Sequence, residues 1–270
     1  MSLRPVVALL TDFGSRDHYA GTMKGVVLGL CPDVTLVDIS HDIDPHDILA
    51  GALELKASYT FFPAGTIFLV VVDPGVGSAR RLLAAEAGAY RFVGPDNGVL
   101  SLVFREAAPK RVVELTERKY ARPTVSRTFE GRDRFAPAAA WLAKGLELSA
   151  LGRTLTTWTT LDVPEPVVTE SLVVAEVLRV DRFGNLVTNL DRRTFERFAG
   201  GGGGARMEIT AGTQGVARMV ATYAEADPGS VCALFGSSDH LEVAVNGGSA
   251  AERLRLVRGA RVTVVRLPGC

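Results

Sequence analysis

Residues 67–80 run Ile-Phe-Leu-Val-Val-Val-Asp-Pro-Gly-Val-Gly-Ser-Ala-Arg. The six apolar residues predict a strand that is buried on both faces, as in a parallel sheet. Asp73 follows this strand directly, which places a carboxylate at the edge where open α/β sheets bind ligands. Arg80 comes seven residues later, beyond a turn tight enough to fold back toward Asp73. The two charges indicate either an ion pair that braces the turn or a functional site, and this stretch alone favours neither.

The residues around this stretch alternate strand and helix patterns as far as about residue 160. We expect strands at 5–11, 34–39, 67–72, 82–86, 90–93 and 112–115, and helices at 18–30, 44–58 and 135–146. This alternation predicts a doubly wound α/β domain with a parallel sheet.

A proline-containing linker at residues 161–166 separates this region from a second one that is mostly β. Short strands with turn signals between them are typical of a small barrel or sandwich. The predicted strands are 172–180, 186–188, 206–209, 231–235, 241–245 and 262–266. We therefore predict two domains, residues 1–163 and 164–270.

The composition argues against several classes of protein. Lys plus Arg and Asp plus Glu both number 30, so no basic footprint for nucleic acid is expected. Although 47% of the residues are hydrophobic, no run approaches the roughly 18 residues of a membrane span. The N-terminus lacks the layout of a signal peptide. Cys31, Cys232 and Cys270 show no metal-ligand spacing. We expect a soluble, cytoplasmic protein with neither nucleic acid nor membrane as a partner.

Three predicted strands of the first domain end in an acid: Asp12, Asp38 and Asp73. Because parallel strands end at one edge of a sheet, these carboxylates are expected to gather there. Such short carboxylates suit the vicinal hydroxyls of a ribose. The glycine run at 200–204 follows a predicted helix rather than a strand, so it does not fit a dinucleotide-binding fingerprint.

Several loops offer weaker candidates. Residues 40–47 hold two histidines and three aspartates, which could bind a metal, although Asp44 before Pro45 is also suited to cap a helix. The turn at 94–98 could present Asn97 to a ligand. The turn at 181–185 offers an aromatic ring and an amide, the pair needed to stack on a base and hydrogen-bond to it. The loops at 128–133 and 237–242 are ordinary capping and hairpin sequences when taken alone.

Six segments, taken together and in order, resemble the S-adenosyl-L-methionine (SAM) hydroxide adenosyltransferase family, whose relatives include the fluorinase and the chlorinase. They are LLTDFGSRDHYAGTMKG, VVDPGVGSARR, GPDNG, TFEGRDRFAPAAA, DRFGNLVTN and SSDHLEVAVNGGSA. The resemblance spans nearly the whole chain. It implies a Rossmann-like N-terminal domain, a smaller C-terminal β-barrel, and a homotrimer whose sites lie between subunits.

The resemblance also implies roles for single residues. Asp12 matches the acid that binds the ribose hydroxyls, and Asp73 and Arg80 match two members of a water-activating Asp–Arg–His triad. The matches in the second domain are Phe183 and Asn185 beside adenine, Asp181 near the methionine amino group, and Ser237, Glu242 and Val245 as further contacts to nucleoside and amino acid. Asp17 and Tyr223 are weaker matches.

Two positions depart from the family pattern. The family loop usually has histidine where this chain has Glu130, so the third triad member is a carboxylate. Two carboxylates that share one arginine repel each other. Glu130 could act as the base for water, or could pair with Arg80 and leave the chemistry to Asp73. Asp239 stands where a glycine is usual, which affects the local turn.

The implied reaction is attack of water or hydroxide at ribose C5′ of SAM, which gives adenosine and L-methionine without a metal or cofactor. One alternative is a SAM- or adenosine-binding protein with little turnover because of Glu130. Another is a SAM-dependent halogenase, which is disfavoured because DPGVGSARR is intact and only a short stretch separates Arg81 from Gly94. A metal-dependent hydrolase that uses residues 41–47 is a further alternative.

Overall fold

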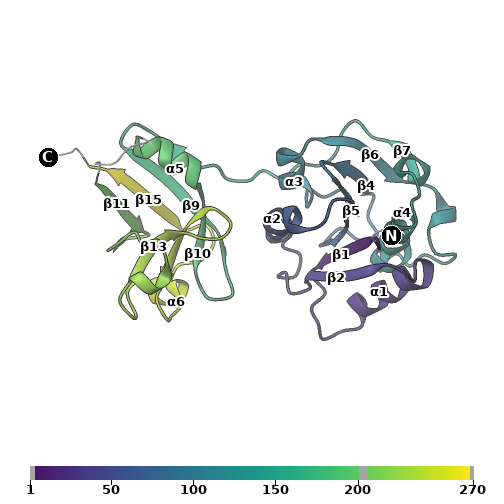
Figure 1. The fold of residues 1–270 in the computed structure, drawn as a ribbon, viewed down its shortest axis with the longest axis horizontal. Coiled ribbons are helices and arrows are strands. Elements are labelled where there is room, and N and C mark those ends of the chain that lie inside the picture. Colours follow the sequence, from purple (N-terminus) through teal and green to yellow (C-terminus); the bar gives the residue numbers. More distant parts are fainter. Residues whose placement is uncertain (1–3, 201–205, 268–270) are drawn as a thin grey trace. The chain divides into compact units, whose positions relative to one another are not determined.

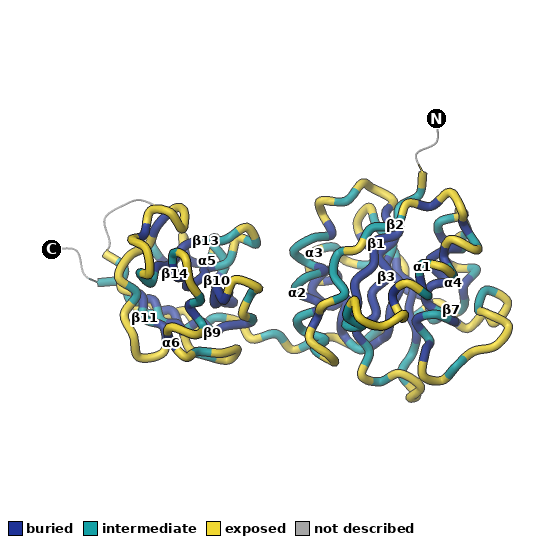
Figure 2. Tube along the Cα trace, turned by 90° about the horizontal axis from the view of Figure 1, so that it is seen from below, coloured by how far each residue is buried: buried dark blue, intermediate teal, exposed yellow. Residues whose placement is uncertain are grey.

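The computed structural model describes residues 4–200 and 206–267. The chain divides into two compact units, Met1–Asp162 and Val163–Cys270, which are called unit 1 and unit 2 below. Each unit has its own apolar core, as the buried segments in Figure 2 show.

Unit 1 is built on a seven-stranded sheet (Figure 1). In sheet order the strands are β2 (Thr35–Ser40), β1 (Val6–Thr11), β3 (Ile67–Val71), β5 (Tyr90–Pro95), β4 (Leu82–Ala87), β6 (Pro109–Leu115) and β7 (Gly152–Thr154). The first four are parallel neighbours, whereas β4 is antiparallel to both β5 and β6, and β7 is antiparallel to β6. The sheet is therefore mixed. The prediction of a parallel sheet was wrong for the half that contains β4, β6 and β7. Strands β4 and β5 are joined by only two residues, which is too short for the crossover that a parallel pair needs.

Helices cover both faces of this sheet. Helices α1 (Tyr19–Leu30) and α4 (Ala136–Ala143) pack on one face, and α2 (Ile48–Ser58) and α3 (Ser101–Glu106) pack on the other. Alternate residues of β3 enter the two cores, with Leu69 in the first and Phe68 in the second. This burial on both faces explains the unbroken apolar run at 67–72.

Two helices have different bounds from those that the sequence indicated, one at its start and one at its end. Helix α2 begins at Ile48 instead of near residue 44, and its N-cap is Asp47, which accepts a hydrogen bond from the Ala50 amide. His46 has a φ of 71°, a left-handed conformation that a helix cannot contain. Helix α4 follows a π-helical turn, Gly131–Phe135, and ends at Ala143. Short 3-10 helices at Tyr59–Phe61, Arg118–Tyr120 and Leu148–Leu151 complete unit 1.

Unit 2 is a nearly closed antiparallel barrel. In sheet order its strands are β12 (Gln214–Val216), β11 (Met207–Ala211), β15 (Arg261–Arg266), β9 (Leu172–Val180), β10 (Leu186–Asp191), β14 (His240–Val245) and β13 (Val231–Phe235), with β8 (Val167–Val168) paired to β9. The two ends of this strand order approach each other where Ala233 of β13 forms backbone hydrogen bonds with Arg218 and Val220, just beyond β12. Unit 2 also holds α5 (Arg192–Ala199), α6 (Ala250–Leu254) and a 3-10 helix at Tyr223–Glu225.

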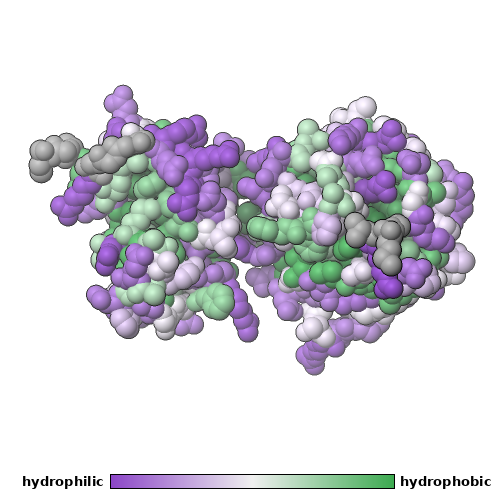
Figure 3. Space-filling model, in the orientation of Figure 1, coloured by the Kyte–Doolittle hydropathy of each residue, from purple (hydrophilic) through white to green (hydrophobic). Residues whose placement is uncertain are grey.

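The glycine run follows α5 and begins with Gly200, which takes a left-handed conformation at the C-terminus of that helix. The rest of the predicted loop, residues 201–204, lies outside the described residues. In Figure 3, hydrophilic residues occupy most of the visible rim of each unit. Within the described ranges, no helix combines the length and the apolar character that a membrane crossing requires.

Candidate active site

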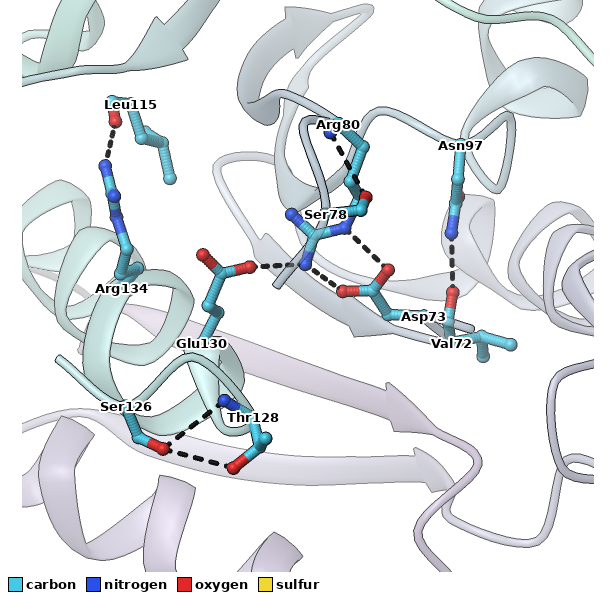
Figure 4. Close-up of polar contacts among 10 residues, drawn as sticks. All are labelled: Val72, Asp73, Ser78, Arg80, Asn97, Leu115, Ser126, Thr128, Glu130 and Arg134. Atoms are coloured by element: carbon cyan, nitrogen blue, oxygen red, sulfur yellow. Dashed lines mark hydrogen bonds and ion pairs between the residues drawn. The ribbon is translucent and has the colours of Figure 1, made fainter. Parts of the chain in front are cut away.

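The turn after β3 brings Asp73 and Arg80 together (Figure 4). Arg80 donates through Nε to Oδ1 of Asp73 at 2.6 Å and through Nη2 to Oδ2, so the pair is bidentate. The two side chains are only 5% and 9% exposed. Gly77 in this turn has a φ of 76°, and a Cβ there would lie 2.4 Å from the carbonyl oxygen of Arg127. The glycine therefore lets the turn lie directly against the loop at 126–130.

A second turn holds the end of β3 in place. Asn97 donates from its side chain to the carbonyl of Val72, the residue before Asp73, at 2.8 Å. Its side-chain oxygen accepts from the Val99 amide. Asp96 is buried and pairs with Arg81, the neighbour of Arg80. The amide of Asn97 is thus engaged by the backbone that positions Asp73, instead of being presented to a ligand.

Glu130 completes the group from the loop before α4. Arg80 Nη2 donates to Glu130 Oε2 at 2.5 Å, and the Glu130 side chain is 12% exposed. Burial lowers the pKa of Arg80, but the hydrogen bonds and charges of Asp73 and Glu130 raise it above its usual value. Arg80 therefore stays cationic between two carboxylates. All three residues were predicted from the sequence, and in the structure both carboxylates contact Arg80 directly.

Asp133 fixes the loop that carries Glu130. Its side chain is fully buried, receives two hydrogen bonds from Arg132 and one from the Ser126 amide, and forms an ion pair with Arg122. Burial raises the pKa of Asp133, but these hydrogen bonds and charges hold it below its ordinary value. Asp133 is thus a buried anchor for residues 126–133, a larger role than the ordinary cap that the sequence indicated.

A cavity of about 490 Å³ opens in front of these residues within unit 1. Asp12, Asp73 and Glu130 all line it, so the structure places the proposed ribose-binding acid beside two members of the triad. Its apolar wall includes three aromatic rings in mutual contact, Phe13, Tyr19 and Phe129. These rings were not predicted as site residues, although each lies within a segment that carried the family resemblance. The volume is in the range of small-molecule sites.

Residues 41–47 hold the loop that carries Asp12. The carbonyl of His41 accepts from the Gly14 amide at 2.7 Å, and the His41 ring lies between Thr11 Oγ1 at 2.8 Å and Asp38 Oδ1 at 3.0 Å. The amide of His46 donates to Asp12 Oδ2 at 2.9 Å. This segment is therefore a brace for one wall of the cavity.

Two of the expected acids are not part of the cavity wall. Strand β2 runs on past Asp38 to Ser40, and Asp38 binds Lys24 and His41 instead of facing the cavity. The expectation that it joins Asp12 and Asp73 was wrong. Asp17 is exposed and does not line the cavity. Among residues 4–200 and 206–267, no three His, Cys, Asp or Glu side chains are grouped to hold a metal ion.

In unit 2 the turn after β9 forms a compact polar group. Asp181 accepts from the amides of Phe183 and Asn185 and from the Asn185 side chain, at 2.8–2.9 Å. Phe183 is left 76% exposed, whereas Asn185 is buried. Gly184 permits this turn because a Cβ there would lie 2.1 Å from Ser249 Oγ. The turn thus exposes an aromatic ring and keeps the Asn185 amide buried and bound to Asp181.

A carboxyl group on β14 belongs to the same region. Tyr223 donates to Glu242 Oε2 at 2.9 Å, and Glu242 is 6% exposed. Burial raises the pKa of Glu242, and the charge of Asp181 raises it further, against opposing effects of Tyr223 and Arg179. Burial, Glu242 and Asp181 raise the pKa of Tyr223 to about 12. The structure therefore groups three of the predicted unit 2 residues, Asp181, Tyr223 and Glu242.

The remaining predicted residues of unit 2 are less closely linked to this group. Ser237 is exposed, in the turn between β13 and β14. The side chain of Val245 packs in the apolar core, so only its backbone is left for a ligand contact. Asp239, in the same turn as Ser237, has a φ of 60°, which explains why glycine would suit this position.

Comparison with known proteins identifies the family. Models described as the N-terminal and C-terminal domains of SAM hydroxide adenosyltransferase match residues 7–152 and 175–263. A curated (R)-S-adenosyl-L-methionine hydrolase from Thermus thermophilus is 38% identical over 97% of this chain and 100% of its own. A fluorinase from Actinoplanes sp. is a more distant relative, 29% identical over 97% of this chain and 98% of its own. A solved structure of an uncharacterized conserved protein from Thermotoga maritima matches with a TM-score of 0.90 and 33% identity, covering 96% of this chain and 100% of that one. The chain belongs to the SAM hydroxide adenosyltransferase family.

Proposed function

We propose that this protein is a SAM hydrolase that forms adenosine and L-methionine by attack of water at ribose C5′. The observation that carries the proposal is the cavity of unit 1, which Asp12 lines together with two carboxylates that share Arg80. Several curated relatives named (R)-SAM hydrolase, 34–38% identical to this chain, support it.

The proposed reaction requires the protein mainly to orient the attacking water and to stabilise the charge that develops on it. The leaving group is a sulfonium that becomes a neutral thioether, so no general acid is required to expel it. An oriented water and a cavity that excludes bulk solvent supply most of the rate enhancement. A carboxylate at Arg80 takes a proton from the water, and the guanidinium stabilises the developing hydroxide. Neither a metal nor a redox cofactor is needed in this scheme.

Substrate contacts are assigned within each unit. In unit 1, Asp12 accepts hydrogen bonds from the ribose hydroxyls, with one of its oxygens already fixed by the His46 amide. In unit 2, Phe183 stacks on adenine and Asn185 hydrogen-bonds to it, while Asp181 and Glu242 bind the methionine amino group. Ser237, Tyr223 and the Val245 backbone are further contacts of unit 2, and Asp17 is a peripheral one of unit 1.

We extend the proposal to the assembly and location of the protein. Residues 1–163 and 164–270 act as separate domains, and the protein is a cytoplasmic homotrimer in which the unit 2 contacts are supplied to a neighbouring subunit's unit 1. SAM is the small-molecule partner, with neither nucleic acid nor a membrane involved. The matched N- and C-terminal family models support the two-domain organisation.

One assay tests the reaction against its alternatives. Purified protein is incubated with SAM, with and without a chelator and with and without fluoride or chloride, and the products are separated by chromatography. We expect adenosine and methionine in equal amounts, unaffected by the chelator. A 5′-halo-adenosine would instead support the halogenase that the fluorinase relatives suggest. Tight SAM binding without product would support a binding protein.

A further inference from the structure

The two carboxylates at Arg80 are hydrogen-bonded differently. Both oxygens of Asp73 accept from Arg80, one from Nε and one from Nη2. Glu130 accepts from Nη2 through Oε2 alone, and its Oε1 receives no hydrogen bond from any described residue. Both residues line the cavity. The Glu130 carboxylate therefore has one oxygen tied to the guanidinium and one oxygen still able to accept a proton (Figure 4).

Protonation has a different consequence for each group. A proton on Asp73 would neutralise the bidentate partner of Arg80 and weaken two charge-assisted hydrogen bonds at once. A proton on Oε1 of Glu130 would leave the Oε2 bond in place. After that proton is gained, Arg80 still has one full carboxylate partner, so the buried cation is never left unpaired.

We propose that Glu130 is the proton acceptor for the attacking water and that Asp73 is the group that holds Arg80 in place. This assignment rests on the proposed function and deepens it. The water oxygen forms the bond to C5′, the C5′–S bond breaks with its electron pair left on sulfur, and a water proton moves to Oε1 of Glu130. The products are adenosine, neutral methionine thioether and protonated Glu130, which releases its proton to solvent.

The charged groups around Glu130 are compatible with this role. Arg80 faces it directly, with Asp73 behind the guanidinium, while Asp12 and His46 line the same cavity. Arg132 also lines the cavity, but its guanidinium is bound to Asp133. Arg80 is thus the one cation of this group that is hydrogen-bonded to Glu130 in the described structure.

The first test compares Glu130→Gln with Glu114→Gln. The Glu130→Gln variant keeps the shape of the side chain and an oxygen for Arg80 but cannot take a proton, so we expect kcat to fall by about 10²–10⁴-fold with little change in KM. Glu114 is also paired with an arginine, Arg153, outside the cavity, so its variant should keep full activity. A fall in kcat of less than about threefold in Glu130→Gln, far smaller than the expected fall of about 10²–10⁴-fold, would overturn the assignment.

The second test uses pH and chemical rescue. An ordinary imidazole titrates about two pH units above an ordinary carboxyl, so Glu130→His should move the acidic limb of the kcat profile to higher pH. Formate or acetate should restore activity to Glu130→Ala but not to Asp73→Ala. Rescue of Asp73→Ala alone would reverse the two roles. Circular dichroism and SAM binding by calorimetry establish that each variant is folded.

The two proposals fail in different ways. A wild-type protein that releases no adenosine from SAM overturns the proposed function together with the role of Glu130. A wild type that does release it, while Glu130→Gln is equally fast, leaves the hydrolase intact and overturns only the role of Glu130.

Discussion

The carboxylates beside Arg80 in unit 1 and those beside the 181–185 turn in unit 2 have different hydrogen-bond partners. In unit 1, Asp73 and Glu130 share a buried arginine, and Asp133 receives hydrogen bonds from another. In unit 2, Asp181 is bound by backbone and side-chain amides and Glu242 by a tyrosine hydroxyl. The charges of Asp73, Glu130 and Asp133 are therefore balanced by hydrogen-bonded arginines, whereas these hydrogen-bond partners of Asp181 and Glu242 are neutral.

This difference suits the two regions to different tasks. A site whose ions are already paired keeps its geometry before any ligand arrives, as a reaction that depends on an aligned water requires. Asp181 and Glu242 repel each other, and although the charge of Arg179 opposes this effect at Glu242, the pKa of Glu242 stays raised, so a bound cation would stabilise the pair. In the proposed function, the methionine amino group of SAM is this cation. Under the proposed function, unit 1 is thus preorganised for chemistry and unit 2 for recognition of the substrate.

The largest expected effect comes from removal of the shared cation. Arg80→Met leaves Asp73 and Glu130 buried without their partner, and breaking a buried ion pair in this way costs about 3–5 kcal/mol of unfolding free energy. Activity should be lost as well. Denaturant unfolding and the adenosine assay measure the two effects.

The control for this variant is Arg153→Met, which removes an arginine whose side chain is 68% exposed beside Glu114. An exposed pair of this kind contributes about 0–1 kcal/mol. If both variants lose the same stability, the ions of unit 1 are not the preorganised group described above.

The next effect tests the contact between the two loops that carry the ions. Gly77→Ala would place a methyl group 2.4 Å from the Arg127 carbonyl, at a φ of 76° that alanine avoids. We expect a loss of about 1–3 kcal/mol and a lower kcat, because the loop with Glu130 must move away from Arg80. Gly65→Ala is the matched control, since it has a φ of 86° but nothing within 4 Å of the added Cβ. Equal losses in the two variants would mean that φ alone, and not the loop contact, requires glycine.

The sequence predicted the charged residues of unit 1 better than the framework behind them. Asp73, Arg80 and Glu130 were found because a buried strand that ends in an acid is a local pattern, and because the family motifs supplied the loop. From the sequence, His41 is a possible metal ligand. Its structural role was missed because its hydrogen bonds to Thr11 and Gly14 form only when residues far apart in the sequence come together at the edge of the sheet. The mixed sheet was missed because the direction of a strand is not encoded in its own composition. The start of α2 was missed because the left-handed His46 breaks a good helical pattern.

A third prediction compares how one carboxyl group of each unit makes the unfolding free energy depend on pH. The pKa of Asp133 is lowered, so the stability that it contributes is present above its unfolded value and is lost as pH falls through the folded value. The pKa of Glu242 is raised, so its contribution is present at low pH and is lost as pH rises through the folded value. As pH rises, the contribution of Asp133 to the unfolding free energy should therefore increase and that of Glu242 should decrease.

The measurement is the unfolding free energy of wild type, Asp133→Asn and Glu242→Gln from about pH 3 to about pH 8, a range that spans the ordinary carboxyl values. Asp133→Asn should flatten the acidic limb, with its largest deficit at high pH. Glu242→Gln should gain stability relative to wild type as pH rises. The same sign of change in both variants would remove the electrostatic contrast between the units.

The smallest expected effect concerns the turn with Asp239, which has a φ of 60°. Asp239→Gly relieves the left-handed backbone but gives up an ion pair with Arg192 between partly exposed side chains, so the net change should stay within about 1 kcal/mol. Asp239→Ala loses the pair and keeps the backbone penalty, so it should be less stable than Asp239→Gly. Thermal unfolding of the two variants gives their order. Relative to glycine, alanine has backbone strain at both residue 239 and residue 77, but only at residue 77 does it also collide with a neighbouring loop. The difference in stability between Asp239→Gly and Asp239→Ala, set against the loss in Gly77→Ala, therefore isolates the collision with the loop. A smaller difference at residue 239 would measure how tightly the loops of unit 1 are packed, and an equal difference would contradict that packing.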